Sequence, residues 1–298
     1  MLPSKSCVAF LAVAELGSFE AAALHLCISA SAVTLRVQTL EKQLGQVLLL
    51  RERPCRVTTS GLQLLQHLQQ QRLREQQLLQ QLSGHNQRNQ FQEVHVATNA
   101  DSLATWLLRV LQPALIQQQI ALKLRLDDQS QTHQLLESGL VNACISIESV
   151  AIQGCVATYL GAMTYKMVAS RAFMQRYFQA AITRDRLKHI PAVIFDAKDD
   201  LHHQVMLKLF GLQQNQYPHH FIPSSTAFVE AIQLGLGFGL VPQYQITTAL
   251  VRGDLVEVIP QAQQQLHLYW HHWKQQSTAL QTMTHHLIAH TQSVMNGH

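Results

Sequence analysis

Residues 18–56, SFEAAALHLCISASAVTLRVQTLEKQLGQVLLLRERPCR, contain two short helical patterns that meet at a tight turn. The patterns run from Phe19 to Leu26 and from Ser29 to Leu44, so only Cys27 and Ile28 separate them. Ser18 and Ser29 stand at N-cap positions, where a hydroxyl can accept from an unpaired backbone N–H. In the second pattern Val33, Val37, Leu40 and Leu44 form an apolar face, opposite Ser31, Leu35, Gln38 and Lys42. This stretch predicts a helix-turn-helix.

A basic loop, Arg51 to Arg56, follows the second helix and contains Pro54. Short strands at 47–50 and 56–58 would make this loop a wing. A helix with a polar face followed by such a wing is typical of proteins that read the major groove and contact phosphates beside it. We expect base contacts from the first turns of the second helix and phosphate contacts from the arginines. The predicted DNA-contacting residues are Ser18, Ser29, Ala30, Ser31, Thr34, Leu35, Arg36, Gln38, Arg51, Arg53 and Arg56.

The positive charge of the chain is concentrated in this part. Residues 1–90 hold nine Lys/Arg and five Asp/Glu, a net charge of +4, whereas residues 91–298 hold thirteen of each. All of the excess therefore lies where phosphates would be met. Because the excess is small, we expect a homodimer or tetramer that places several such modules on one double-stranded DNA.

A helix is also predicted at 4–16, and a long helix rich in Gln and Leu runs from Thr58, its expected N-cap, to about Gly84. Its positions 65, 68, 72, 75, 79 and 82 read Leu, Leu, Arg, Glu, Leu and Leu, a moderate coiled-coil signal. From residue 93 onward, strand-like runs alternate with helical patterns, which predicts a mostly parallel sheet with crossover helices. Acidic residues follow several of these strands, where ligands of such sheets bind. Carboxylates there favour a ligand with a cationic side chain.

The order of Phe10, Gly17-Ser18-Phe19, Ala22-Ala23, Ala32-Val33, Leu40-Glu41, Gly45 and Arg51 resembles LysR-type transcriptional regulators. Asn99 to Leu108 (NADSLATWLL), Phe195-Asp196, Asp199-Asp200 and Leu268 to His271 are similar to the arginine- and lysine-responsive branch of that family. The resemblance implies an α+β multi-domain protein with a winged helix-turn-helix, a linker helix that pairs two subunits, and a two-lobed α/β effector domain like a periplasmic binding protein. The expected division is 1–58, 59–84, a hinge at 85–92, and 93–298. Lobe I would take about 93–163 and 266–298, and lobe II about 164–265.

The resemblance also implies that Ser102, which begins a helix after a strand, contacts the effector. A plain N-cap at Asp101 or Ser102 is the alternative. The full predicted effector-binding set is Asn99, Asp101, Ser102, Asp127, Asp128, Ser146, Asp196, Asp199, Ser224 and Ser225. Ala30, Thr34 and Leu35 depart from residues common in the family, so the family does not indicate which operator this chain reads.

Other classes of protein find less support in the residues. The five cysteines form no CxxC pair, so we expect free, buried thiols rather than disulfides or zinc fingers. His286 and His290 are four apart on one helix without a third ligand, and neither a metal nor a cofactor is expected. No catalytic motif is present, so an enzyme is the least supported alternative. Neither a signal peptide nor an apolar run of membrane-spanning length is found, which predicts a cytoplasmic protein without membrane contact.

Three alternatives stay open from the sequence. A LysR-type regulator could respond to an unrelated effector, an architectural DNA binder could ignore ligands, and a solute-binding protein would explain the second part of the chain alone. RNA polymerase is a further candidate partner of a regulator.

Overall fold

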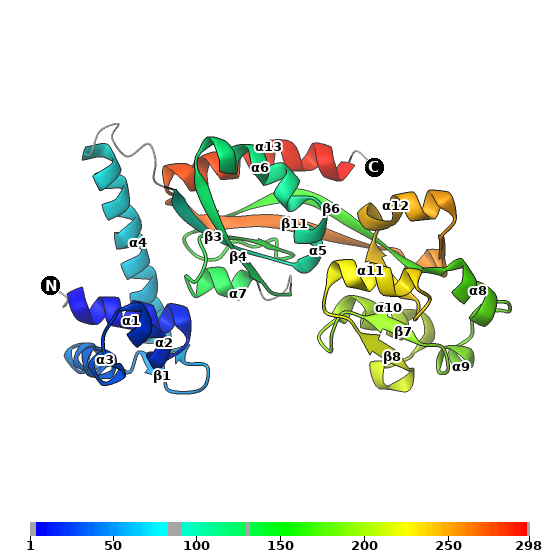
Figure 1. The fold of residues 1–298 in the computed structure, drawn as a ribbon, viewed down its shortest axis with the longest axis horizontal. Coiled ribbons are helices and arrows are strands. Elements are labelled where there is room, and N and C mark those ends of the chain that lie inside the picture. Colours follow the sequence, from blue (N-terminus) through cyan, green and yellow to red (C-terminus); the bar gives the residue numbers. More distant parts are fainter. Residues whose placement is uncertain (1–3, 83–90, 129–131, 297–298) are drawn as a thin grey trace.

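The computed structural model describes residues 4–82, 91–128 and 132–296, and its amino-terminal module is the predicted winged helix-turn-helix (Figure 1). It contains α1 (Ser4–Leu16), α2 (Phe19–His25), α3 (Ala30–Leu44), β1 (Leu49–Leu50) and β2 (Arg56–Val57). Both predicted caps are present, because the Ser18 hydroxyl accepts from Ala21 N–H and the Ser29 hydroxyl from Ala32 N–H. The chain turns between α2 and α3 at Cys27, whose φ of 53° is left-handed.

The inner face of α3 packs into the core of this module. Val33, Val37 and Leu40 are buried in one cluster with Phe10 of α1. Leu44 is 38% exposed, so its assignment to the apolar face is wrong. It is the last residue of the helix, and the chain leaves the core at Gly45, which has a left-handed φ of 65°. The opposite face is exposed as predicted, at Ser31, Leu35, Gln38 and Lys42.

Helix α4 (Thr59–Leu82) follows the wing, and Thr58 caps it as predicted by accepting from Gly61 N–H at 3.0 Å. Leu65 and Leu68, expected in a stripe facing a second subunit, are instead buried in the core of the helix-turn-helix module. These two leucines pack inside their own chain, because this end of α4 lies against α1. Arg72 and Glu75 are exposed, whereas the Leu79 and Leu82 side chains lie outside the described residues. Most of the predicted hinge at 85–92 also lies outside them.

The first lobe contains the parallel strands β4-β3-β5. Its elements are β3 (Gln92–Thr98), α5 (Ala100–Thr105), α6 (Leu107–Gln117), β4 (Ile120–Leu126), α7 (Thr132–Glu137), β5 (Ala143–Ser146) and α13 (Thr278–Asn296). Helices α6 and α13 cover one face of its sheet and α7 lies on the other (Figure 1). The final helix therefore returns to lobe I, as the family resemblance implied.

The second lobe has shorter elements around a smaller sheet. They are α8 (Arg171–Tyr177), α9 (Arg184–Leu187), β7 (Ala192–Ile194), α10 (Asp200–Phe210), η2 (Gln214–Gln216), β8 (His219–Phe221), α11 (Ser225–Gln233), β9 (Gly239–Pro242), α12 (Gln243–Arg252), β10 (Leu255–Glu257) and η3 (Pro260–Ala262). Strands β8 and β10 are short. Each has three residues, too few to give a clear period of two.

Two long strands connect the lobes: β6 (Cys155–Ser170) and β11 (Gln264–Trp273). The main sheet has the order β10-β6-β11-β5-β3-β4, and β9 also pairs with β6. Strand β11 is antiparallel to both neighbours because it brings the chain back from lobe II to lobe I, and β9 and β10 are antiparallel to β6. The predicted parallel pairing is therefore found in β4-β3-β5 and in the separate two-stranded sheet β7-β8, whereas the rest of the main sheet is antiparallel.

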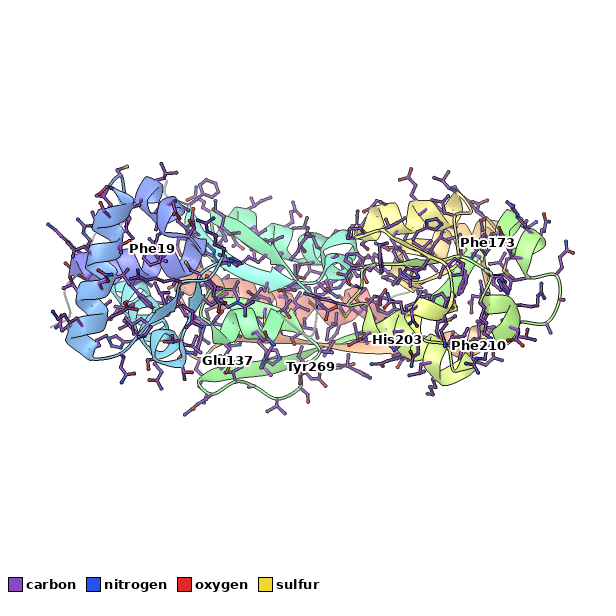
Figure 2. All side chains as sticks on the ribbon, turned by 90° about the horizontal axis from the view of Figure 1, so that it is seen from below. Phe19, Glu137, Phe173, His203, Phe210 and Tyr269 are labelled. Atoms are coloured by element: carbon purple, nitrogen blue, oxygen red, sulfur yellow. The ribbon has the colours of Figure 1, made fainter. Side chains whose placement is uncertain are left out.

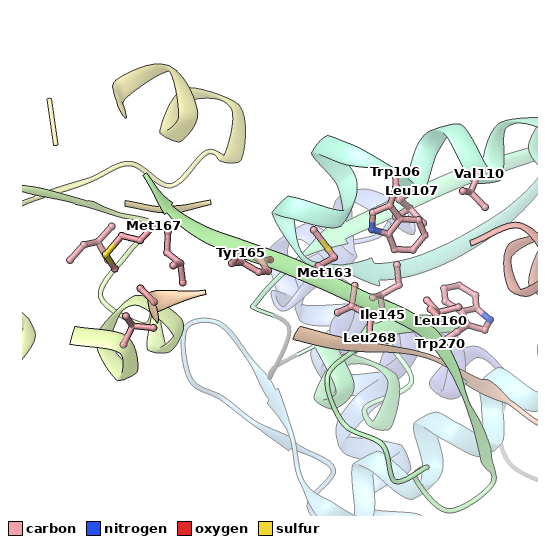
Figure 3. Packing of buried hydrophobic residues seen from close by; sticks show 14 of the residues in the cluster. Trp106, Leu107, Val110, Ile145, Leu160, Met163, Tyr165, Met167, Leu268 and Trp270 are labelled. Atoms are coloured by element: carbon pink, nitrogen blue, oxygen red, sulfur yellow. The ribbon is translucent and has the colours of Figure 1, made fainter. Parts of the chain in front are cut away.

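One hydrophobic cluster runs through both lobes along β6. Leu160, Met163, Tyr165 and Met167 follow one another on this strand and all belong to the cluster (Figure 3). In lobe I the cluster includes Trp106, directly after α5, and Trp270 of β11, whose indole N–H donates to Thr284 of α13 at 3.1 Å. The strand that joins the lobes is thus also part of their common core.

No single helix in the described ranges is long and apolar enough to cross a membrane. Helices α1 and α2 together have the length and composition of a membrane span, but they are bent by 119° relative to each other.

All five cysteines are free, as predicted. Cys7, Cys144 and Cys155 are buried and Cys55 is half-buried, but Cys27 is exposed because it lies in the turn between α2 and α3. The expectation of buried thiols is therefore wrong for Cys27.

Candidate functional site

The exposed face of the helix-turn-helix carries most of the residues predicted to contact DNA. Ala30, Ser31, Leu35 and Gln38 of α3 are exposed, and so are Arg51, Arg53 and Arg56 of the wing. Arg36 is half-buried beside them. All four predicted hydroxyls are engaged within the module. Those of Ser18 and Ser29 form the caps, that of Ser31 lies 2.9 Å from the Ser29 hydroxyl, and that of Thr34 donates to the Ala30 carbonyl at 2.9 Å.

The wing is attached to the start of α2. The Arg51 guanidinium lies 5.5 Å from the centre of the Phe19 ring, a cation–π arrangement. Arg56 lies 3.9 Å from Glu52 in an exposed ion pair, which has little energetic weight. The Arg51 contact holds the basic loop against the start of α2, within the winged helix-turn-helix arrangement that readers of the major groove use.

A cavity of about 300 Å³ lies between the two lobes. Lobe I provides Asn99, Ala100, Asp101, Leu126, Asp127 and Asp128, and Tyr165 of β6 lies at the crossing. Lobe II provides Phe195, Asp196, Asp199, Leu201, Pro223, Ser225, Phe228, Leu240, Val241, Pro242 and Gln245. Many of these residues follow the carboxyl ends of β3, β4, β7 and β9, which meet here although they are far apart in the sequence.

Asp101 is the centre of a hydrogen-bond network across the cavity. Its carboxylate accepts from the Ser225 hydroxyl at 2.6 Å and from the Tyr165 hydroxyl at 2.8 Å. Gln245 Nε2 donates in turn to Ser225 Oγ at 2.8 Å. Burial raises the pKa of Asp101 above that of a solvated aspartate, and the two hydrogen bonds oppose the rise only in part. Burial, followed by the charge of Asp101, also raises the pKa of Tyr165.

Asp199 is buried on the lobe II side. Its carboxylate accepts from His202 N–H and from Phe195 N–H, both at 3.2 Å, so it caps α10 and holds the end of β7 against it. Burial raises the pKa of Asp199, and these backbone hydrogen bonds oppose the rise. Asp101, Asp127, Asp128, Asp196 and Asp199 together place five carboxyl groups around one cavity, with no Lys, Arg or His among the described lining residues.

The structure brings most of the predicted effector-binding residues together but leaves three serines out of the lining. Ser102 is fully buried, and its hydroxyl lies 3.8 Å from the Met163 sulfur. Ser146 is buried at the end of β5 and accepts from Glu148 N–H. Ser224 caps α11 by accepting from Ala227 N–H. The N-cap of α5 is Asn99, so the alternative of a cap at Asp101 or Ser102 is wrong.

Sequence reasoning missed Tyr165 and Gln245. Tyr165 lies within a continuous strand of 16 residues, where no local signal marks the crossing between lobes. Gln245 lies in the first turn of α12, directly after β9. The junction of a strand and a helix around Pro242 could have indicated this position, because the aspartates were found by the same kind of junction.

Among the described residues, no group of three or more His, Cys, Asp or Glu is arranged to hold a metal ion. The rings of His286 and His290 stack, with their centres 4.1 Å apart.

Two family descriptions match the chain: residues 5–62 match "Bacterial regulatory helix-turn-helix protein, lysR family" and residues 92–292 match "LysR substrate binding domain". The HTH-type transcriptional regulator ArgP of Photobacterium profundum is 42% identical over 277 residues, 93% of each chain. Vibrio parahaemolyticus ArgP is 39% identical over 94% of each chain.

Solved structures agree with these matches. The crystal structure of ArgP from Mycobacterium tuberculosis superposes with a TM-score of 0.81 at 33% identity over 98% of each chain. Full-length LysG from Corynebacterium glutamicum with bound effector Arg superposes with a TM-score of 0.75 at 30% identity, covering 96% of this chain and 97% of that one. With its winged helix-turn-helix and two-lobed domain matched over nearly their whole length, this chain belongs to the LysR family of DNA-binding transcriptional regulators.

Proposed function

We propose that this regulator binds a basic amino acid, arginine or lysine, between its lobes, and that the bound ligand changes how its helix-turn-helix engages promoter DNA. The charge of the cavity carries this proposal, since five aspartates line it without a cationic side chain among the described lining residues. Carboxyl groups held close together in a partly dehydrated space disfavour one another's ionised forms. A cationic ligand removes this penalty.

The uncharged part of the lining supports the same ligand class. Leu126, Leu201, Phe228 and Leu240 offer an apolar wall against which the methylene stem of arginine or lysine can pack. Gln245 Oε1 is buried and has no hydrogen-bond partner among the described groups. An unpaired buried acceptor is costly, so an ammonium or guanidinium donor would be favoured there.

The proposed ligand places its α-ammonium at Asp101 and its side-chain cation toward Asp127, Asp128, Asp196 and Asp199. Its α-carboxylate faces the first turn of α5, where helical N–H groups have no partner within the helix. Ser102 takes no direct part in this arrangement, because its hydroxyl is buried outside the lining. The bound arginine of C. glutamicum LysG and the name ArgP of several relatives support the ligand class.

Titration calorimetry on the full chain tests the proposal. Arginine or lysine should bind, citrulline, which replaces the guanidinium by a neutral urea, should bind at least about tenfold more weakly, and glutamate should not bind. Asp127→Asn should weaken arginine binding by a similar factor. Asp185→Asn, which changes an exposed aspartate paired with Lys188 outside the cavity, is the matched control. Binding of a neutral or acidic metabolite in place of both basic amino acids would refute the proposed ligand.

On the DNA side we propose that Ser31, Thr34, Leu35 and Arg36 face base edges and that the wing arginines contact phosphates. The protein acts in this proposal as a homodimer or tetramer, with the expected division at 1–58, 59–84, 85–92 and 93–298, in the cytoplasm and without catalysis. The small positive charge of residues 1–90 supports an assembly, because one module would make few phosphate contacts.

A further inference from the structure

The DNA-binding module touches lobe I of its own chain through Glu15, near the end of α1. The guanidinium of Arg125, on β4, donates to the Glu15 carbonyl at 3.2 Å. The Glu15 carboxylate lies 3.9 Å from the Arg72 guanidinium of α4. Carbonyls at the end of a helix lack helical partners, and this end of α1 carries negative partial charge, so a cation is favoured there. Glu15 is thus held by lobe I and by the linker helix together.

A second contact joins the linker helix to α7. Gln66 Nε2 donates to the Glu137 carbonyl at 2.8 Å. The Gln69 side chain lies so close to Gly139 that a Cβ at this glycine would collide with it. Figure 2 shows the labelled Glu137 at the border between α7 and the DNA-binding module. The two contacts use different elements on the DNA-binding side, α1 of the module and the linker helix α4, and different elements of lobe I, β4 and α7.

Both lobe I elements are connected directly to the cavity. Arg125 immediately precedes Leu126, Asp127 and Asp128, all of which line it. Helix α7 begins at Thr132, whose N–H donates to the Asp128 carbonyl and whose hydroxyl donates to the Ile145 carbonyl. A displacement of the Asp127–Asp128 pair would therefore act on Arg125 at one end and on α7 at the other.

We propose that these two contacts, Arg125 with Glu15 and Gln66 with Glu137, form a latch that docks the DNA-binding module on lobe I. A cation bound at Asp127 and Asp128 shifts the balance between the docked and undocked states of this latch. This rests on the proposed function for the ligand. The latch gives the ligand a route to the DNA-binding module within one subunit, because the cavity and the docking contacts share the same short elements. A ligand can shift the docked population only if it binds docked and undocked states unequally.

Hydrogen exchange of the full chain, read by mass spectrometry, tests the latch. The variants are Arg125→Ala and Gln66→Ala. Their matched controls are Lys123→Ala, on the same strand but paired with Glu93, and Gln63→Ala, an exposed residue of the same helix. Each protein is measured without ligand and with saturating arginine, and its arginine affinity is measured by calorimetry. Helix α7 has six residues, so its protection depends on packing rather than on its own stability.

Without ligand, the α7 amides of both variants should exchange at least threefold faster than those of the wild type, and both controls should match the wild type. Arginine should change exchange in the last turn of α1 threefold or more in the wild type and in the controls, but not in the variants.

Unchanged α7 exchange in both variants would overturn the docking contact. If arginine binds and the last turn of α1 does not respond in the wild type, control of the latch by the ligand is refuted. Absence of arginine binding would refute the proposed ligand, while the ligand-free comparison would still decide the docking contact.

Discussion

Asp101 differs from the other cavity aspartates because two side-chain hydroxyls from outside lobe I already donate to its carboxylate. Tyr165 comes from the strand that crosses between the lobes and Ser225 from the start of α11 in lobe II. Hydrogen bonds alone do not compensate for the lost hydration, so the pKa of Asp101 remains raised. A bound ammonium supplies the missing positive charge. Asp101 would then both link the two lobes across the cavity and change its protonation state when a cation binds.

Arginine binding should therefore release protons. In the empty cavity the raised pKa lets Asp101 retain a proton at higher pH than a solvated aspartate does, and a bound cation lowers that pKa. Affinity should rise with pH up to the pKa of the empty cavity. Calorimetry in buffers with different ionisation enthalpies should show proton release near that pH, and Asp101→Asn should remove the Asp101 share. Identical enthalpies in all buffers for the wild type would contradict this expectation.

His202 should make the folding stability of lobe II decrease at acidic pH. It is buried between Tyr217 and Phe238, and neither ring nitrogen has a hydrogen-bond partner among the described groups. Burial lowers its pKa from 6.5 to about 4. Between pH 6.5 and about pH 4, His202 is therefore protonated in the unfolded chain but neutral in the folded chain. The free energy of unfolding is at its full value above pH 6.5 and decreases as the pH drops toward 4.

Denaturant unfolding of the wild type and of His202→Phe between pH 7.5 and 4 isolates this effect. The wild type should lose about 3 kcal/mol more than the variant over that range, following from roughly 1.4 kcal/mol per pKa unit. Phenylalanine keeps the aromatic packing and removes the titrating group. Parallel pH profiles for the two proteins would show that His202 is not protonated on unfolding.

The helix-turn-helix could be predicted accurately from the sequence, because local chemistry determines where its helices begin. Ser18, Ser29 and Thr58 cap their helices through their own hydroxyls, and the period of α3 follows from contacts with a single neighbouring core. The linker helix shows where this reasoning ends. Leu65 and Leu68 have the spacing of an inter-subunit stripe, yet they are buried against α1. A period of apolar residues indicates that a face is covered, but not by which partner.

The wing should act on DNA through charge alone. Arg53 is exposed on the loop between β1 and β2, so Arg53→Ala should weaken binding to every DNA sequence by a similar factor. Losing one phosphate contact per module should reduce the slope of log K against log salt by about 1 for each module bound. Fluorescence anisotropy with two unrelated duplexes at several salt concentrations measures both quantities. Arg252→Ala, an exposed arginine of lobe II, is the control. Loss on only one duplex with an unchanged slope would reassign Arg53 to base reading.

The cavity is a property of the whole molecule, and for that reason only part of it could be predicted. Asp127, Asp196 and Asp199 were found because each follows a strand, and ligands gather at such ends. The sequence did not show that β6 continues from Cys155 to Ser170 through both lobes, so Tyr165 was missed. Ser102 was assigned by family position, but its hydroxyl is directed into the core near Met163. Proximity across the lobes depends on the course of β6 and β11, which local patterns do not encode.

Because both lobes line the cavity and share one hydrophobic cluster along β6, a ligand should stabilise them as one unit. Arginine at 100 times its dissociation constant should add about 2.7 kcal/mol, which for a domain of this size raises the melting temperature by roughly 5–10 °C. Differential scanning calorimetry of the full chain should show one transition for the two lobes, and arginine should move it without splitting it. Glutamate at the same concentration should leave it in place, and Asp127→Asn should reduce the shift while Asp185→Asn preserves it. Two transitions, of which arginine moves only one, would mean that the ligand binds a single lobe and that the cavity does not bridge them in solution.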